Sequence, residues 1–437
     1  MEKLAQEKAL QKSWWAAAAG LPLDELARLG ALRMIEDALI AEVDDYLERH
    51  QDARDAVGHA LVVRNGRARP RPFTIGSGTV MVTAPRVNDK RVVGGERMKF
   101  TSKILPPYLR RSPKVSEVLP LLYLRGLSTG DFREALEVLL GEEASGLSPS
   151  AITRLTTGWQ EEYRAWSQRS LAERDYVYIW VDGVHFNVRL EDERLACLVV
   201  IGARPDGTKE VIALEDGYRE STESWKALLR NLKKRGMRAP VVAVGDGALG
   251  FWAALRDVWP ATREQRCWVH VIANVLDKLP KGLQPKAKST LHAAMNAPDK
   301  ETCAKHITEF DEAFGAKYPK AVASLNDNAE KLQTHFDFPA EHWVHLRTTN
   351  PIESTFATVK LRQRVTKGAG SRNAGLAMAF KLLLAAEQHW RKLNGAELLP
   401  LVREGAVFVD GERVERKPRL KLIPKIEMTN PKKRSAA

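Results

Sequence analysis

The densest run of apolar residues lies near the middle of the chain, at Tyr176–Val181, and one carboxylate, Asp182, follows it directly. Valine, isoleucine, tyrosine and tryptophan crowd this run, which predicts a strand buried on both faces. An ionised aspartate on such a strand is costly unless it is paired or holds a cation. More strand follows Asp182, which lies near the middle of its strand, whereas a second apolar strand, Ala239–Gly245, ends in an acid, Asp246. We therefore expect two buried strands that each present an aspartate.

A third acid, Glu353, lies in the stretch Thr349-Asn-Pro-Ile-Glu-Ser-Thr355. This stretch predicts a helix with Asn350 as N-cap, Pro351 at the first position and Glu353 at the third. Two strand-borne aspartates and a helix-borne glutamate are typical of a two-metal site for phosphoryl transfer, holding two Mg²⁺ or Mn²⁺ ions. For Glu353 alone a plain capping box explains the residue equally well.

The N-terminal part predicts helices at 2–19 and 22–50, where apolar residues follow a helical period. The following stretch, Arg64–Arg71, holds four arginines among glycine and proline, and suits either a flexible arm on phosphates or an exposed linker. Alternating residues at Phe73–Thr83 predict a β-ribbon that turns at Gly76-Ser-Gly78.

Three short helical patterns fill the region from Ser116 to about Gln168. Gly126 ends the first, Ser128 caps the second, and Ser148 with Pro149 begins the third. Two short helices and a third that begins with small residues have the shape of a helix-turn-helix, although an ordinary helical hairpin is equally compatible. In the helix-turn-helix interpretation the major groove would be faced by Ser150, Thr153 and Arg154.

From residue 175 onward the element order is three strands, a helix, a strand and a helix. This is the order of a ribonuclease-H-like mixed α/β sheet, with one parallel crossover that places Asp246 beside Asp182. The pattern from 271 to 340 is helical and predicts an insertion before Glu353. A last helix is expected at about 373–394, and a basic, proline-broken tail from Arg413 is expected to be mobile.

We divide the chain into an N-terminal helical region (1–60), a basic arm and β-ribbon (61–112), a helix-turn-helix domain (113–172), a first part of the core (173–280), an α-helical insertion (281–340), the last part of the core with Glu353 (341–396) and a basic tail (397–437).

Two other motifs suggest different chemistry. Gly245-Asp-Gly-Ala-Leu-Gly250 matches the GxGxxG fingerprint of a dinucleotide site, but its second position is Asp246, whose carboxylate would repel a pyrophosphate. It also follows three strands instead of opening the first βα unit. Cys267 and His270 form a CxxH pair, which is too few ligands for a structural zinc. We expect a strand end that buries Cys267 and lets His270 reach the carboxylates or the scissile phosphate, with a core histidine as the alternative.

The helix after Glu353 carries five cations and no acid. On a helix and loop leaving the site, such charges would hold a DNA backbone more readily than they would form a merely solvated face. These residues are Lys360, Arg362, Arg364, Lys367 and Arg372.

Composition sets the remaining limits. The chain has 437 residues and a formal net charge of +13, which favours a polyanionic partner, and nucleic acid over a membrane. Only three cysteines are present and no signal-peptide core or membrane span is expected, which fits a reducing cytosol.

Four pieces together resemble the mutator-type transposases of bacterial insertion sequences: Val181–Phe186, Val244–Ala248, Gln265–His270 and Thr349–Thr355, in that order. The stretches Tyr123–Thr129 and Ser148–Arg154 resemble the family's helix-turn-helix. The resemblance implies a DDE site on a ribonuclease-H-like fold, with Asp182, Asp246 and Glu353 as metal ligands and with Cys267 and His270 as the family's C/DxxH signature. It also implies binding to the terminal inverted repeats of an insertion sequence, DNA strand cleavage and transfer, and dimers or larger assemblies on paired ends.

We therefore expect a cytoplasmic, nucleoid-associated DNA transposase. The alternatives are a catalytically inactive relative that binds DNA as a repressor, and a nucleotide-dependent oxidoreductase that NAD(P) binding would reveal.

Overall fold

The computed structural model describes residues 20–125, 140, 149–186, 195–217, 221–247, 250–366 and 371–415. Two compact units divide the chain, and each is described by itself. The first unit comprises Met1–Gln168, His185–Leu195 and Phe356–Ala385. The second unit comprises Arg169–Val184, Ala196–Thr355 and Ala386–Ala437.

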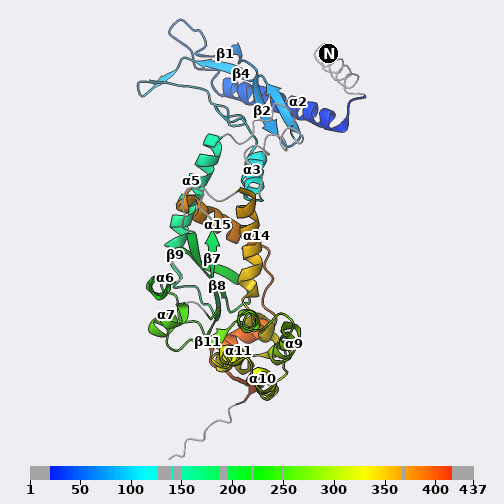
Figure 1. The fold of residues 1–437 in the computed structure, drawn as a ribbon. Coiled ribbons are helices and arrows are strands. Elements are labelled where there is room, and N and C mark those ends of the chain that lie inside the picture. The colour runs from blue at the N-terminus through cyan, green and yellow to red at the C-terminus, as the bar shows by residue number, and fades with distance from the viewer. Residues whose placement is uncertain are drawn as a thin grey trace, which may run out of the picture. The chain divides into compact units, whose positions relative to one another are not determined.

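The first unit begins with the long helix α2 (Leu23–Arg49), as predicted for 22–50 (Figure 1). Antiparallel strands β2 (Arg71–Ile75) and β3 (Gly78–Val82) form the predicted ribbon, which turns between Ile75 and Gly78. Alternate side chains of this ribbon face the helix, as a pleated strand requires. Phe73, Val80 and Val82 of the ribbon form a small core with Leu39 of α2 and with Leu105.

The arginine-rich stretch is not the flexible arm that we predicted, because its first half is a strand. Strand β1 (Val62–Arg67) pairs antiparallel with β4 (Pro85–Asp89), and its register shifts between Arg64 and Arg67. Gly66 lies in that shift with a φ of +63°, so the glycine that suggested a break supports a β-bulge instead. Two short strands, β5 (Val92–Val93) and β6 (Glu96–Arg97), complete this part as an exposed hairpin.

The helices α3 (Pro113–Arg125) and α5 (Pro149–Ser167) match the first and third helices of the expected helix-turn-helix. The expected middle helix and its turns fall mostly in 126–139 and 141–148, outside the described residues. Helix α5 packs on α15 (Arg372–Glu387): the Trp166 and Phe380 ring centroids are 4.9 Å apart, and Lys381 donates to Glu162 at 2.7 Å. Helix α15 ends seven residues before the predicted end at Asn394.

The second unit is built on a five-stranded mixed sheet. Its strands are β7 (Tyr178–Phe186), β8 (Leu195–Ala203), β9 (Lys209–Gly217), β10 (Val242–Gly245) and β11 (Arg263–Arg266), in the order β11-β10-β7-β8-β9. Strand β10 runs parallel to both β7 and β11, whereas β8 and β9 are antiparallel. The parallel crossover that should bring the Asp246 strand beside the Asp182 strand is therefore confirmed.

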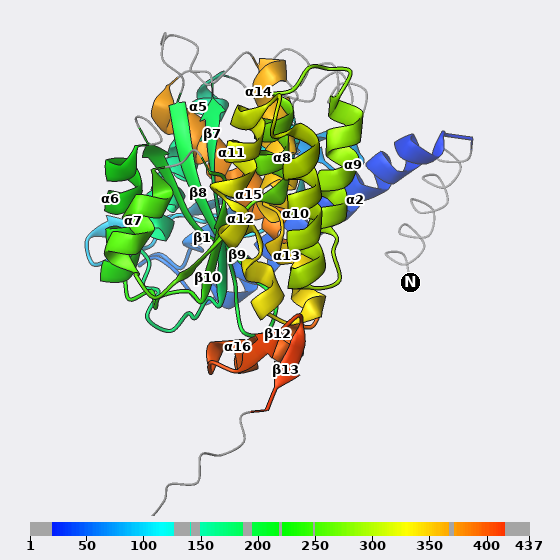
Figure 2. The ribbon, with the colours of Figure 1, turned by 60° about the horizontal axis from the view of Figure 1, so that its bottom comes forward.

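Helices cover both faces of this sheet (Figure 2). On one face α6 (Thr222–Lys234) and α7 (Phe251–Val258) bury Trp225 and Phe251 against Ile179 and Val181. The side chains between these on β7 point to the opposite face of the sheet. On that face the Trp180 indole N–H donates to the His345 carbonyl at 2.8 Å. Odd-numbered residues of β7 thus pack against the helices on one face of the sheet, and even-numbered residues contact the helices on the other.

The segment for which we expected a helical insertion has only helical elements between 268 and 346. It consists of α8 (Trp268–Leu276), α9 (Gln284–Met295), α10 (Lys300–Phe314), α11 (Pro319–Asn326), α12 (Ala329–Leu332), the 3₁₀ segments η1 (Thr334–Asp337) and η2 (Ala340–His342), and α13 (Trp343–Leu346). A core of its own, which includes Leu291, Phe310 and Phe336, holds the insertion together.

The predicted basic tail begins too early in the sequence. After the 3₁₀ turn η3 (Ala396–Leu398), helix α16 (Leu399–Arg403) and a hairpin of β12 (Val407–Val409) and β13 (Glu412–Val414) are folded, and Phe408 is buried. The Arg403 guanidinium donates to Asp175 at 2.8 Å and to the Ala239 carbonyl at 2.7 Å, which ties this segment to the sheet. Among the described residues, no helix is long and apolar enough to cross a membrane.

Candidate active site

Three neighbouring parallel strands share one register. Trp180 of β7 and Gln265 of β11 both pair with Val244 of β10. Asp182, Asp246 and Cys267 each follow one of these residues by two positions. Since side chains alternate along a strand, the three side chains continue the row on the face that carries the helical insertion. The two predicted aspartates are therefore neighbours at one end of the sheet.

Both aspartates are half-buried and each accepts a hydrogen bond from the next backbone amide. The Gly183 amide donates to Asp182 Oδ1 at 2.8 Å, and the Gly247 amide donates to Asp246 Oδ1. In each aspartate, one carboxylate oxygen is therefore held toward the backbone amide of the following glycine.

The backbone of Asp246 is fixed by two further side chains. Its carbonyl accepts from the Trp252 indole at 2.6 Å and from Arg266 Nη1 at 3.1 Å. The Arg266 guanidinium also lies 4.2 Å over the Trp252 ring, a cation–π contact. Burial lowers the pKa of Arg266 to about 10, which leaves it charged at neutral pH. Arg266 and Trp252 thus hold the strand end that carries Asp246.

Glu353 enters from α14 (Asn350–Thr366), but one position later in the helix than predicted. The carbonyl of Thr349 accepts the Glu353 amide at 3.1 Å, so Thr349 is the N-cap and Asn350 is the first helical residue. The Thr349 hydroxyl donates to Glu353 Oε1 at 2.5 Å and lies 3.3 Å from Cys267 Sγ. Thr349 and Glu353 therefore do not form the capping box that we considered as an alternative, since that arrangement requires the glutamate at the third helical position.

Cys267 and His270 lie beside Glu353. Cys267 is fully buried, as predicted, whereas 31% of the His270 side chain is exposed, so it is not a core histidine. The hydrogen bond that the protonated His270 ring donates to Cys267, together with the nearby charges of Cys267, Asp246 and Glu353, raises the pKa of His270 to about 9, despite burial. Burial raises the pKa of the Cys267 thiol, but the hydrogen bonds from His270 and Thr349 outweigh it and the net pKa is lowered.

Among the described residues, one group offers three metal-ligating atoms that all lie within 4.8 Å of one another: Cys267, His270 and Glu353. The distance from His270 Nδ1 to Glu353 Oε1 is 3.7 Å. Asp182 and Asp246 do not belong to this tight group, although Asp246 is close enough to raise the pKa of His270. The structure thus places Cys267 and His270 next to Glu353, with Asp246 in electrostatic range of His270.

The predicted DNA-contacting residues are only partly described. Arg154 and Lys360 are exposed on α5 and α14, and Arg372 is half-buried at the start of α15. Arg154 lies near enough to Arg111 to add to the lowering of the Arg111 pKa that burial causes. The side chains of Ser150, Thr153, Arg362 and Arg364, and Lys367 as a whole, lie outside the description.

Close packing explains two glycines of the dinucleotide-like motif. A Cβ on Gly245 would lie 2.8 Å from Val181 Cγ2, and a Cβ on Gly250 would lie 2.3 Å from the Thr222 amide nitrogen. The neighbour of Gly245 is on the adjacent strand β7 and that of Gly250 is the first residue of α6, so close packing requires glycine at both positions. The motif is accounted for by the fold.

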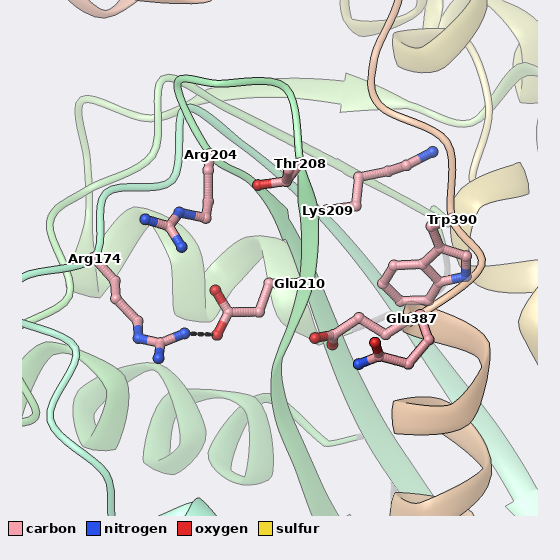
Figure 3. Close-up of a pocket in the computed structure, with 8 residues that line it drawn as sticks. Arg174, Arg204, Thr208, Lys209, Glu210, Glu387 and Trp390 are labelled. Atoms are coloured by element: carbon pink, nitrogen blue, oxygen red, sulfur yellow. Dashed lines mark hydrogen bonds and ion pairs between the residues drawn. The ribbon is translucent and has the colours of Figure 1, made fainter.

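A separate cavity of about 320 Å³ opens near the turn between β8 and β9 (Figure 3). Arg174 forms an ion pair there with Glu210, and Glu387 accepts from the Val211 amide at 2.7 Å. Trp390 and Lys209 line the same cavity. The cavity borders the carboxyl end of β8. There the Ala203 carbonyl accepts from the Val177 amide, which precedes the first residue of β7. The cavity therefore lies near the start of β7, away from Asp182.

Sequence reasoning missed Thr349 and Arg266 as functional residues. Thr349 could have been found, because a threonine directly before Asn-Pro is an N-cap candidate as good as the asparagine. The role of Arg266 depends on its contact with the Asp246 carbonyl, for which the sequence offers no signal.

Comparison with known proteins agrees with the resemblance found in the sequence. The pattern of the family described as "Transposase, Mutator family" matches residues 4–392. The transposase for insertion sequence element IS6120 of Mycolicibacterium smegmatis is 59% identical over 302 residues, which cover 69% of this chain and 93% of that protein. The transposase for element IST2 of Acidithiobacillus ferrooxidans is 45% identical over 287 residues, covering 64% and 95%. The transposase for element IS256 in transposon Tn4001 of Staphylococcus aureus is 26% identical over 333 residues, covering 75% and 82%. The chain therefore belongs to the Mutator family of transposases.

Proposed function

We propose that this protein is a DNA transposase that binds the terminal inverted repeats of its insertion sequence and catalyses DNA strand cleavage and strand transfer. Asp182, Asp246 and Glu353 are its DDE triad. The observation that carries the proposal is the shared register of Asp182 in β7 and Asp246 just after β10, with Asp246 and Glu353 of α14 both close enough to His270 to raise its pKa. The strand order β11-β10-β7-β8-β9 and the helical insertion support a ribonuclease-H-like core.

The donor chemistry of this triad fits Mg²⁺ or Mn²⁺. Three carboxylates supply the oxygen ligands that such ions prefer, and they leave room for substrate phosphate oxygens. A pair of bound ions would activate the attacking oxygen and stabilise the leaving one.

The protein's own side chains prepare the carboxylates for this role. Thr349 orients Glu353, and Arg266 with Trp252 fixes the strand end of Asp246. His270 Nδ1 lies 3.7 Å from Glu353 Oε1, a position from which the imidazole would reach a scissile phosphate held at the triad.

Charge in the first unit supports DNA as the partner. Residues 62–114 contain thirteen lysines and arginines but only two acids, whereas α2 contains eight acids and three arginines. Arg64 is paired with Asp44 of α2, and Arg91 is bound to the buried Asp89. Most other cations in 62–114 are exposed, as a phosphate-binding surface requires. The expected helix-turn-helix at 113–172 and the cations from Lys360 to Arg372 would extend that surface.

The remaining assignments follow from the same proposal. The protein would act in the cytoplasm at the nucleoid, as a homodimer or larger assembly on paired element ends and target DNA. A catalytically inactive DNA-binding repressor is the second candidate, but the presence of all three carboxylates speaks against it.

The test is cleavage of a labelled duplex that carries the element's end, with and without Mg²⁺. We expect metal-dependent nicking or joining by the wild type and by Asp257→Asn, a matched change at an exposed carboxylate that pairs with Arg230. We expect none from Asp246→Asn, although that variant still binds the duplex. Binding without cleavage by the wild type, with Mg²⁺ and Mn²⁺ and with both ends supplied, would favour the repressor.

A further inference from the structure

Cys267, His270 and Glu353 combine a sulfur, a nitrogen and an oxygen ligand in one place. Their ligand atoms lie within 4.8 Å of one another, and those of His270 and Glu353 are 3.7 Å apart. Around a tetrahedral Zn²⁺, with ligand bonds of roughly 2.0–2.3 Å, ligand atoms are separated by about 3.3–3.8 Å. Small side-chain rotations would therefore close the three residues around one ion.

The ligand types select for a borderline-soft cation. Thiolate and imidazole suit Zn²⁺ and related transition metals, whereas Mg²⁺ takes oxygen ligands. We propose that Cys267, His270 and Glu353 form a site for a single Zn²⁺-like ion, which is separate from the Mg²⁺ pair of the DDE triad but shares Glu353 with it.

The backbone holds these ligands in position before any ion arrives. The Cys267 amide donates to the Gly245 carbonyl at 3.0 Å, which fixes the cysteine at the end of β11. Helix α8 begins at the next residue, so His270 follows within its first turn. The Thr349 hydroxyl donates to Glu353 Oε1 and also contacts Cys267 Sγ at 3.3 Å, and such contacts around a metal site orient its ligands.

The exposure of the ligands indicates an open site. Cys267 is fully buried, whereas 31% of the His270 side chain and 34% of the Glu353 side chain are exposed. Three protein ligands with one accessible side leave a fourth position for water, as in catalytic zinc sites, and differ from the four ligands of a structural site. This is why the CxxH pair alone gave no zinc site in the sequence: the third ligand is 83 residues further along the chain.

The chain contains an internal control for this site. Cys303-Ala-Lys-His306 in α10 has the same CxxH spacing. Cys303 is buried in the core of the insertion and His306 bonds to Glu309 at 2.8 Å, so the two do not converge on a third ligand. Spacing alone therefore does not make the site, and Cys303 provides a matched substitution.

The shared glutamate has a functional consequence that rests on the proposed DDE activity. An ion bound by Cys267, His270 and Glu353 withholds Glu353 from the Mg²⁺ pair. We expect micromolar Zn²⁺ to inhibit Mg²⁺-dependent cleavage by the wild type, and to inhibit Cys267→Ser far less.

Metal binding is tested without DNA, on the purified full-length protein. Co²⁺ replaces Zn²⁺ as a spectroscopic probe, because a cobalt–thiolate bond gives a charge-transfer absorption that oxygen and nitrogen ligands lack. We expect one equivalent of Co²⁺ to produce this band in the wild type and in Cys303→Ser, and added Zn²⁺ to abolish it. Cys267→Ser should lose the band, and Glu353→Gln should keep it with at least tenfold weaker binding.

The opposite results are equally clear. A folded wild type without the band, or a band of the same strength in Cys267→Ser, overturns the zinc site. If Cys267→Ser fails to fold, as judged by circular dichroism, His270→Gln and Glu353→Gln decide, because both must weaken Co²⁺ binding and an unchanged affinity in both refutes the proposal. Cleavage in chelator-treated buffer with Mg²⁺ tests the DDE proposal separately, so the two can fail independently.

Discussion

The hydroxyl of Thr349 donates a 2.5 Å hydrogen bond to Glu353 Oε1, one helical turn further along α14. The same hydroxyl also reaches Cys267 Sγ at 3.3 Å. One N-cap residue therefore links the helix that supplies the glutamate to the strand end that supplies the cysteine.

Removing the Thr349 hydroxyl should weaken the binding of Mg²⁺ more than it lowers the stability of the folded protein. We expect Thr349→Val to raise the Mg²⁺ concentration for half-maximal cleavage by about 10–100-fold, the usual effect of losing a partner that orients a metal ligand. Thr349→Ser should stay close to the wild type. Thr355→Val is the matched control, because the Thr355 hydroxyl bonds only to the Pro351 carbonyl at 3.2 Å. Equal Mg²⁺ requirements in Thr349→Val and Thr355→Val would contradict the orienting role.

Acid should destabilise the second unit through His335. This side chain is fully buried, and burial together with the charge of Arg347 lowers its pKa to about 3. An unfolded histidine has a pKa of about 6.5, so between pH 6.5 and 3 the unfolded state binds the extra proton and stability falls as the pH falls. The slope is at most about 1.4 kcal/mol per pH unit.

Chemical unfolding at pH 7.5 and 5.0, followed by tryptophan fluorescence, measures this loss. His335→Phe replaces the ring among its neighbours Phe336 and Trp343 and should make the loss smaller by about 2 kcal/mol. The exposed His292 serves as the control, since His292→Gln should leave the pH dependence unchanged. An identical pH dependence in all three proteins would exclude His335 as the cause.

Gly250 should be intolerant of any side chain. Gly250→Ala places a methyl group 2.3 Å from the Thr222 amide nitrogen, where backbone must move, and we expect a loss of about 1–3 kcal/mol in the free energy of unfolding. A Cβ on Gly282 meets nothing within 4 Å, so Gly282→Ala should change stability by less than about 1 kcal/mol. Denaturant titration of both variants gives the comparison, and a neutral Gly250→Ala would contradict the packing explanation.

Arg403 should anchor the C-terminal hairpin. It donates to Asp175 and to the Ala239 carbonyl, and only 14% of its side chain is exposed. Arg403→Ala leaves a partly buried carboxylate without its main partner, so we expect a loss of about 2 kcal/mol or more. Arg413→Ala, at an exposed position of β13, should be neutral. Limited proteolysis after residue 396 would show the same ranking, and equal resistance of the two variants would argue against the anchor.

The features that the sequence predicted correctly depend on local patterns. Buried apolar strands that present Asp182 and Asp246, and a helical run from 271 to 340, are visible in the periodicity of side chains. The features that it missed depend on partners far along the chain. Strand β1 is polar and arginine-rich, and only its pairing with β4 makes it a strand. The folded segment around Phe408 depends on Arg403 reaching Asp175, 228 residues earlier.

The candidate site shows the same division. The identities of Asp182, Asp246 and Glu353 could be proposed from their contexts, and the pairing of the two aspartate strands followed from the crossover rule. The start of α14 was displaced by one residue, because Thr349 and Asn350 are both good N-caps and only the bond to the Thr349 carbonyl decides. The convergence of Cys267 and Glu353 required the whole insertion to fold between them.

The order of strands in the sheet has a consequence for how the protein is made on the ribosome. Strand β7 with Asp182 is central and is synthesised first among the strands of this sheet. Strand β10, which precedes Asp246, follows after β8 and β9, and Glu353 arrives only after the 80 or so residues of the insertion. A nascent or truncated chain that stops within the insertion already possesses the basic segment 62–114 and both aspartates, but it lacks the third acid. Such a chain could occupy element ends without cutting them, so premature termination would yield a competitor of the complete enzyme.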